Sequence, residues 1–297
     1  MISILIPVYN LNVIPLVTAL QRQGEDFGIP FEILVADDAS YTASVIAGNA
    51  SLSLMPNVRY HAFTENLGAQ RIRHVMAGMA LYPTLLLVDS DAMVLDDQFY
   101  ARYAALADAK TVVFGGIAYE QAEHRDNLRW WYGTNRESYL ADKFNRRPGN
   151  FLTTFNLLIP REALLGEMAP ENMTRYGHED TFLSMQLEKD GVPIVHINNP
   201  LLHTGLSSNE DFLRQTEGAI HNLWALYSSY RPLSLLRKRS RLVRLYEWLR
   251  RTGMHRVYGA WFILNENRLR QNLLSAAPSL RKMDQYKLGK FIEYSLA

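Results

Sequence analysis

The chain has 297 residues, a net charge of +1 and no cysteine. The balanced charge excludes a dedicated nucleic-acid binder, which would be strongly basic, so we expect no nucleic-acid partner. The lack of cysteine excludes disulfides, a thiolate nucleophile and cysteine-ligated metal centres. We find neither a signal-peptide pattern at the start nor an apolar run of the roughly 20 residues that span a bilayer. We therefore expect a cytoplasmic protein, either soluble or peripheral at the inner membrane face.

The first part of the chain alternates between strand and helix patterns. Ile2 to Val8 is a β-branched apolar run and predicts a buried strand. A helix is expected after Asn12, with Pro15 in its first turn and with Gly24 and Pro30 ending it. Phe31 to Ala36 and Val58 to Phe63 predict the next two strands.

Residues 66–79 then show the apolar spacing of a helix, and Thr84 to Val88 predicts a strand buried on both faces. This order of elements predicts an α/β fold with a mostly parallel central sheet flanked by helices. Ligands of such sheets bind at the carboxyl ends of the strands, and polar clusters follow strand after strand there. We therefore expect the functional site at that edge.

The second half is less regular. We expect strands at Thr111–Ala118, Phe151–Ile159 and Val192–Ile197, a helix at about 180–189, and a loop or insertion at 120–148. From about Asn209 the pattern becomes helical and basic. This predicts a catalytic domain at 1–208, with a nucleotide-binding half at 1–95 and an acceptor half at 96–208, and a helical C-terminal region at 209–297.

Two carboxylates, Asp89 and Asp91, directly follow the buried strand that ends at Val88. Acids spaced in this way can share a hard divalent cation and the oxygens of a nucleotide. The alternative is a solvated loop in which an aspartate caps the next element. The position at a strand end favours a functional role.

Asp37 and Asp38 end the second strand and can accept hydrogen bonds from a base and from ribose. Taken alone, they are more typical of a turn with a helix cap. Arg71 and Arg73 follow Asn66-Leu67-Gly68 at the start of a helix, where free N–H groups and guanidinium donors suit oxygen-rich ligands. Taken alone, both arginines are ordinary exposed helix charges.

Together these motifs resemble those of the family 2 glycosyltransferases, which have the GT-A fold. The resemblance covers about residues 2–95. Its motifs are Ile4-Leu5-Ile6-Pro7-Val8-Tyr9-Asn10, Leu34-Val35-Ala36-Asp37-Asp38-Ala39-Ser40, Asn66-Leu67-Gly68 with Arg73-His74, and Leu87-Val88-Asp89-Ser90-Asp91. Four motifs in the same order and spacing are far more specific than any one of them.

The resemblance implies a role for each matching residue. Pro7 and Tyr9 would line the nucleoside pocket, and Asp38, with Asp37 beside it, would bind the base, usually uracil. Arg73 matches a family arginine, although its neighbours here are Ile72 and His74. Asp89 would contact ribose and metal, and Asp91 would be the chief ligand of Mn²⁺ or Mg²⁺ on the diphosphate.

Gly177-His178-Glu179-Asp180 resembles the family's Glu-Asp motif near the acceptor. Transfer with inversion needs a base that takes the proton of the acceptor hydroxyl. Asp180 is the predicted base, with Glu179 as its partner or as an acceptor ligand. The same residues also suit the start of a helix, and both roles can hold at once.

His203 follows the last predicted core strand and is a candidate metal ligand, because neutral imidazole suits Mn²⁺. A structural histidine is about equally expected. Trp130 and Trp131 lie in the predicted loop and can stack on the faces of an acceptor sugar, or can simply pack the loop. Asn156 falls where the family has a loop behind the donor sugar, on the acceptor side.

Residues 231–256 contain nine Arg or Lys residues against one acid, Glu247, with leucines interleaved. Such a segment can lie as an amphipathic helix on anionic lipid, which would fit a lipid-linked acceptor. It can equally pack on the core or on a second subunit, so a homo-oligomer stays open.

The sequence therefore predicts a metal-dependent, inverting glycosyltransferase. We expect it to use a nucleotide-diphosphate sugar, with UDP favoured, and a saccharide or lipid-linked acceptor, as in cell-surface polysaccharide or glycoconjugate synthesis. The alternatives are a nucleotidyltransferase-type enzyme and a non-catalytic relative that binds a sugar or a partner. Neither the first nor the second turn carries Gly-x-Gly-x-x-Gly, which counts against a dinucleotide-dependent dehydrogenase.

Overall fold

The computed structural model describes residues 1–107, 110–121, 124–145 and 151–296. The strands are β1 (Ile2–Val8), β2 (Phe31–Asp37), β3 (Val58–Ala62), β4 (Thr84–Val88), β5 (Ala92–Met93), β6 (Val112–Phe114), β7 (Ile117–Ala118), β8 (Asn156–Pro160), β9 (Ile194–His196) and β10 (Leu201–His203). The helices of the first two-thirds are α1 (Ile14–Phe27), α2 (Ala43–Ala50), the 3₁₀ helix η1 (Ser51–Leu54), α3 (Ala69–Met79), α4 (Phe99–Ala104), α5 (Leu128–Arg136), α6 (Ala141–Asn145), α7 (Arg161–Leu164) and α8 (Glu179–Lys189). The C-terminal helices are α9 (Asn209–Ser229), α10 (Leu233–Arg239), α11 (Arg241–Arg251), α12 (Met254–Leu273) and α13 (Leu280–Leu296).

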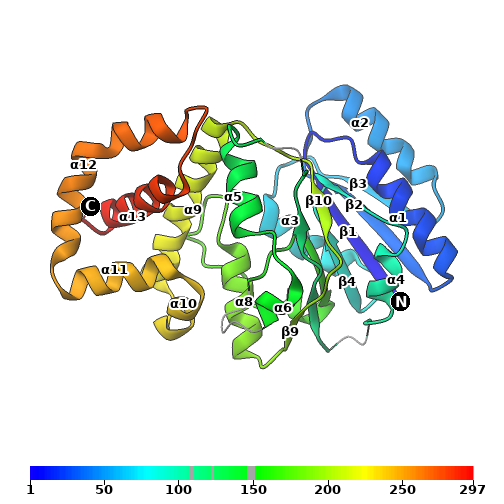
Figure 1. The fold of residues 1–297 in the computed structure, drawn as a ribbon. Helices are drawn as coiled ribbons and strands as arrows, with labels where there is room; N and C mark the ends of the chain where they lie inside the picture. Colours follow the sequence, from blue (N-terminus) through cyan, green and yellow to red (C-terminus); the bar gives the residue numbers. More distant parts are fainter. Residues whose placement is uncertain (108–109, 122–123, 146–150, 297) are drawn as a thin grey trace.

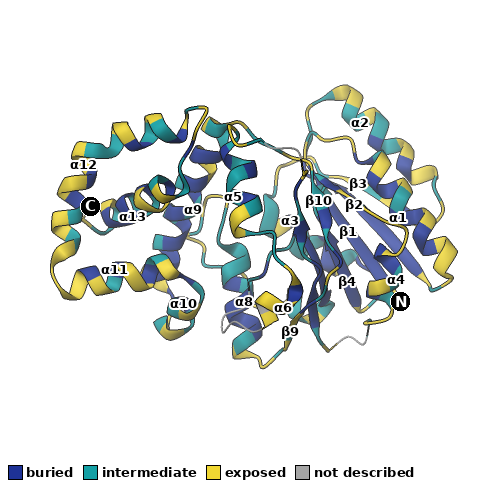
Figure 2. Cartoon of the chain, viewed as in Figure 1, coloured by how far each residue is buried: buried dark blue, intermediate teal, exposed yellow. Residues whose placement is uncertain are grey.

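The central sheet is mostly parallel, as the sequence predicts. Among the described residues it has seven strands in the order β3-β2-β1-β4-β8-β6-β9, and only β8 runs antiparallel to its neighbours. Strands β1, β2 and β4 are almost fully buried because helices cover both of their faces (Figures 1 and 2). Their carboxyl ends therefore meet at one edge, where the polar motifs gather.

A second sheet of three short strands, in the order β5-β10-β7, lies beside this edge. Strand β10 pairs antiparallel with β5, which sets His203 opposite Ala92, and parallel with β7. This small sheet was not predicted, because its strands have only two or three residues and show no apolar alternation.

The predicted strand Thr111–Ala118 is wrong as a single element. It breaks at Gly115-Gly116 into β6 and β7, which belong to different sheets. Gly116 has a φ of 100°, and a Cβ on Gly115 would come 2.2 Å from the Tyr103 hydroxyl. The two glycines therefore allow the chain to change sheets under tight packing.

Other predicted boundaries shift. Strand β8 begins at Asn156 rather than at Phe151. Helix α1 continues through Gly24 and ends at Phe27, before Gly28 with its φ of 68° and ahead of Pro30. Gly24 instead allows close packing, because a Cβ there would come 2.5 Å from the Phe31 ring. Within the predicted loop 120–148, residues 128–136 and 141–145 form α5 and α6, while 122–123 and 146–148 lie outside the described residues.

The C-terminal helices α9–α13 gather at the end of the molecule opposite β3 and α2, with α5 and α8 between them and the sheet (Figure 1). They enclose two further apolar clusters, one around Phe291 and Tyr246 and one around Phe262 and Leu213. The predicted amphipathic helix at 231–256 is divided among α10, α11 and the start of α12. No helix in the described part of the chain is both long and apolar enough to cross a bilayer.

Candidate active site

The centre of the site is a group of charged side chains from three elements. Arg73 on α3 forms an ion pair with Asp89, which follows β4, and both side chains are largely buried. Burial lowers the pKa of Arg73, but the charges of Asp89 and Asp180 outweigh that effect and raise it above its usual value. Arg73 is thus a fixed cation between two carboxylates that are far apart in the sequence.

Asp180 lies in the first turn of α8, and its Oδ1 accepts a hydrogen bond of 3.3 Å from the backbone N–H of Thr154. Burial raises its pKa to about 7; Glu179 and Asp89 raise it too, while Arg73 opposes the rise. A carboxyl group with a pKa near neutrality can both take and release a proton, as a general base must.

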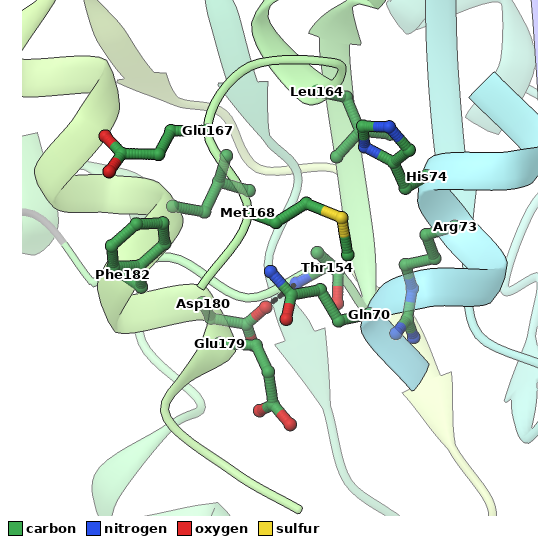
Figure 3. A pocket seen from close by; sticks show the side chains of 11 residues that line it. Gln70, Arg73, His74, Thr154, Leu164, Glu167, Met168, Glu179, Asp180 and Phe182 are labelled. Carbon is green, nitrogen blue, oxygen red and sulfur yellow. Dashed lines mark hydrogen bonds between the residues drawn. The ribbon is translucent and has the colours of Figure 1, made fainter. Parts of the chain in front are cut away.

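Arg73 and Asp180 lie on opposite walls of an open cleft between α3 and α8 (Figure 3). The side chains that complete the walls are Gln70, His74, Thr154, Leu164, Glu167, Met168, Glu179, Phe182 and Leu183. The cleft is therefore polar near Asp180 and apolar toward Leu164 and Phe182. This mixture suits a ligand with both hydroxyl groups and carbon-bound surface.

Asp91 and His203 form a second polar pair beside this cleft. The Nε2 atom of His203 lies 3.4 Å from Oδ2 of Asp91, and the antiparallel pairing of β10 with β5 brings them together. Burial raises the pKa of Asp91, although His203 opposes the rise, and burial lowers the pKa of His203. The imidazole is therefore neutral at pH 7, which is the form that binds metal ions.

The Asp91–His203 pair fits a divalent cation of the Mn²⁺ or Mg²⁺ type. Two ligands at right angles, each about 2.1 Å from an ion, lie about 3 Å apart, close to the observed separation. Gly205 leaves room for this carboxylate, because a Cβ there would come 2.2 Å from Oδ2 of Asp91. Within residues 1–107, 110–121, 124–145 and 151–296, no three His, Asp or Glu side chains gather into a complete metal site. Phosphate oxygens and water would have to supply the remaining ligands.

Aromatic and charged side chains surround His203 and hold its ring in place. Tyr119 and Phe155 stack on its two sides, with ring centroids at 5.4 and 5.3 Å. Arg129 of α5 approaches its Nε2 at 3.3 Å and bonds Glu137 at 2.9 Å. The sequence did not point to Arg129, because it lies in a segment that was expected to be a loop.

The carboxylates of Asp37 and Asp38 accept hydrogen bonds from backbone N–H groups. Asp37 accepts hydrogen bonds from the Ser40 N–H at 2.7 Å and from the Tyr60 hydroxyl at 2.9 Å. Asp38 accepts from the N–H groups of Leu67 and Gly68, at 2.7 and 3.0 Å. The turn-forming alternative is thus realised for Asp37, whereas Asp38 fixes the loop before α3. Binding of a nucleobase by either residue remains a prediction.

Pro7 lies in β1, and Tyr9 directly follows that strand, with 52% of its surface exposed. The Tyr9 ring meets the exposed Tyr41 ring edge to face at 6.1 Å. Tyr41 was not predicted, since a lone aromatic residue after a turn carries no motif. The two tyrosines offer apolar faces to a flat ligand at this position.

Two of the predicted acceptor residues are buried. Asn156 is fully buried in β8, where its amide donates to the carbonyls of Gly116 and Asn199 and accepts from the Tyr103 hydroxyl. Trp130 is also buried and donates from its indole N–H to the Glu120 carbonyl, so the packing alternative is realised for this residue. Glu179 lines the cleft and raises the pKa of Asp180, and both of its carboxylate oxygens also accept from the Gly177 N–H. Its role as partner of Asp180 or as acceptor ligand stays a prediction.

Trp131 remains partly exposed, with its ring stacked on Trp130 at 6.2 Å. Both tryptophans belong to α5 rather than to a loop. Arg71 is exposed on α3, which agrees with the alternative that it is an ordinary surface charge of the helix.

Comparison with known proteins adds an independent observation. The sequence matches the family described as Glycosyl transferase family 2 over residues 3–165, which is more than half of the chain. The chain belongs to glycosyl transferase family 2. Comparison with curated proteins gives no match.

Solved structures show that this family 2 chain has the GT-A fold. Mannosyltransferase PcManGT from Pyrobaculum calidifontis, solved with GDP-Man and Mn²⁺, is 14% identical, with 99% of this chain and 86% of that chain covered and a TM-score of 0.56. TarS from S. aureus is 19% identical, with coverage of 99% and 55% and a TM-score of 0.53. TarS 1-349 in complex with UDP-GlcNAc is 16% identical, with coverage of 99% and 92% and a TM-score of 0.51.

In this glycosyl transferase, the match to the family model ends at residue 165, before two residues of the candidate site. Asp180 and His203 lie beyond residue 165, yet the fold brings them to the same edge as Asp89 and Asp91. Tyr176 also belongs here. Although 64% of its surface is exposed, desolvation of its hydroxyl and the charges of Asp89 and Asp180 raise its pKa. No motif in the sequence marks this tyrosine.

Proposed function

We propose that the chain transfers a sugar from a nucleoside diphosphate sugar, with UDP as the favoured nucleotide, to an acceptor hydroxyl with inversion. The observation that carries this proposal is the position of Asp180, whose pKa is near 7, across a cleft from Arg73. Arg73 pairs with Asp89, and the charge of Asp89 also acts on the Asp91–His203 pair. Family membership supplies the reaction class.

In the proposed reaction, the acceptor hydroxyl enters the cleft between α3 and α8 and gives its proton to the carboxylate of Asp180. The acceptor oxygen forms a bond to the anomeric carbon while the bond from that carbon to the diphosphate oxygen breaks. The diphosphate leaves with the electron pair. Because the acceptor attacks from the side opposite the leaving group, this single displacement inverts the anomeric centre.

Arg73 has a positioning role in this reaction. It holds the Asp89 carboxylate at the end of β4, and its charge limits the rise in the pKa of Asp180. Asp91 and His203 would hold Mn²⁺ or Mg²⁺, which when bound supplies positive charge to the diphosphate. PcManGT was solved with Mn²⁺, which supports the choice of a divalent cation.

The proposal is tested by calorimetric titration of the protein with UDP, GDP and their sugars, with and without Mn²⁺. Both nucleotides belong in the test because PcManGT was solved with GDP-Man and TarS 1-349 with UDP-GlcNAc. We expect binding of one class of donor that strengthens with Mn²⁺, and slow donor hydrolysis in the same samples. Donor binding without any hydrolysis or transfer would favour a non-catalytic relative.

A further inference from the structure

Helix α11 exposes apolar side chains on the face that points away from the protein. Its other face packs inward through the buried side chains of Val243, Tyr246 and Leu249. On the outer face, Leu245 is 46% exposed and Trp248 is 59% exposed. An exposed tryptophan on a helix whose inner face is already packed is not needed for folding.

Helix α12 continues this exposure. Met254, Val257, Trp261 and Leu264 recur at intervals of three and four residues, which places them in one stripe along the helix. Their exposed fractions are 46%, 60%, 37% and 86%. Together with Leu245 and Trp248, these residues form what we call the α11–α12 outer surface, at the end of the molecule remote from β1–β3 (Figures 1 and 2).

The α11–α12 outer surface is bordered by positive charge. Residues 231–273 contain eleven Arg or Lys residues and only two acids, Glu247 and Glu266. Glu247 is paired with Arg237, and Glu266 with Lys290 at 2.6 Å. Lys238 and Arg239 both form ion pairs with Glu188, at 2.7 and 2.6 Å. The other exposed cations of α11 and α12 are Arg241, Arg244, Arg250, Arg251, Arg256 and Arg268. Among these, Arg250 donates to the Tyr227 hydroxyl and Arg244 to the backbone carbonyls of Arg237 and Lys238, so their positive charges are not neutralised by an acid.

We propose that the α11–α12 outer surface docks on an anionic lipid membrane. Large apolar side chains enter the boundary between headgroups and acyl chains, while arginines at the rim meet the anionic headgroups. The long arginine side chains can lie along the apolar surface and still extend their charges outward. This inference does not depend on the proposed sugar transfer.

A second copy of the chain fits this surface less well. In a two-fold dimer the same surface meets itself, so the arginine rim would face another arginine rim. The described residues provide no free acid on α11 or α12 to compensate, because both acids are already paired. The positive charge of this surface therefore favours an anionic partner over a second copy of the chain. The exposed apolar side chains on α11 and α12 favour lipid as that partner.

The test is sedimentation of the full chain with vesicles, in the absence of any sugar donor. One set of vesicles is phosphatidylcholine alone, and the other contains roughly one-third phosphatidylglycerol. We expect pelleting with the anionic vesicles only, and a loss of pelleting as the salt concentration rises, because screening weakens attraction between surface charges.

Matched variants separate the apolar contribution from the charge. Leu264→Ser is compared with Leu54→Ser, because both leucines are 86% exposed but Leu54 lies in η1, at the other end of the molecule. Arg251→Gln with Arg256→Gln is compared with Arg22→Gln with Arg214→Gln, which changes the net charge equally. We expect each outer-surface variant to weaken binding about tenfold or more, and each control to bind like the wild type. Unchanged thermal unfolding midpoints will confirm that the variants are folded.

Three results would overturn the proposal. The first is equal pelleting with neutral and anionic vesicles, and the second is no pelleting with either. The third is a concentration-dependent dimer that Leu264→Ser dissociates and Leu54→Ser does not, which would assign the surface to a second copy of the chain.

Discussion

The imidazole of His203 and the carboxylate of Asp91 lie 3.4 Å apart, and two short strands make this contact. The Thr204 N–H and hydroxyl both donate to the Asp91 carbonyl, at 2.9 and 2.7 Å, and so fix the turn that carries the carboxylate. The late histidine is therefore built into the same edge as the early aspartates. Its position follows from backbone pairing and does not require a bound ion.

Replacement of Asp180 by Asn should lower kcat by at least about 100-fold, because the amide cannot accept the acceptor's proton. Donor binding, measured by calorimetry, should change little. Glu179→Gln is the neighbouring control and should lower kcat much less, since the Glu179 carboxylate is already engaged by the Gly177 N–H and the amide oxygen of glutamine can accept the same bond. Turnover near the wild-type level in Asp180→Asn would assign the base to another group.

The value of kcat/KM should rise between pH 6 and pH 8, with a midpoint near the Asp180 pKa of about 7. The reason is that only the ionised carboxylate can act as the base. A pH-rate profile at saturating metal will check this. A flat profile over that range would show that the ionisation of Asp180 does not control the rate.

The same pKa predicts a pH-dependent effect on stability. In the unfolded chain Asp180 has a pKa of about 3.9, so the raised folded pKa stabilises the protein at low pH, and this contribution is lost as the pH rises through 7. Asp180→Asn should therefore raise the thermal unfolding midpoint relative to wild type more at pH 8 than at pH 5. The two proteins are compared at both pH values by calorimetry. An equal difference at both would contradict a raised pKa.

Chelation of divalent ions should abolish transfer, and Mn²⁺ or Mg²⁺ should restore it. His203→Ala should raise the metal concentration needed for half-maximal activity by about tenfold or more, because one protein ligand is lost. Gly205→Ala should have a similar effect without removing any ligand, since its Cβ would displace the Asp91 carboxylate. Gly191→Ala is a control outside the site, because a Cβ there meets no atom within 4 Å although its φ is 69°. If His203→Ala and Gly205→Ala both kept full transfer activity after chelation, this metal site would be excluded.

Replacement of Asn156 by Leu should destabilise the fold by about 3 kcal/mol, because buried partners of its amide lose their hydrogen bonds. These partners are the Gly116 and Asn199 carbonyls and the Tyr103 hydroxyl. Urea unfolding measures the change. A stability equal to that of wild type would show that this buried network is not needed.

Much of the fold of residues 1–95 could be predicted from the sequence, because β1, β2, β4 and α3 carry clear apolar patterns and polar motifs lie at their ends. The role of Asn156 could not be predicted, since an isolated asparagine reads the same whether it faces a ligand or is buried among carbonyls. The role of Trp130 could not be predicted for the same reason, because its packing is set by α5 and by strands far away in the sequence. Gly205 and Arg129 were missed because their importance depends entirely on which residues lie opposite them.

The three-stranded sheet has a consequence for the order of assembly. Strands β1–β4 are complete within the first 88 residues, so that part of the sheet can form while the rest of the chain is still being synthesised. Strand β10, which carries His203, emerges more than a hundred residues later, and β5 must wait for it. A nascent or truncated chain that stops before residue 201 would keep the early strands and still lack a finished reaction centre.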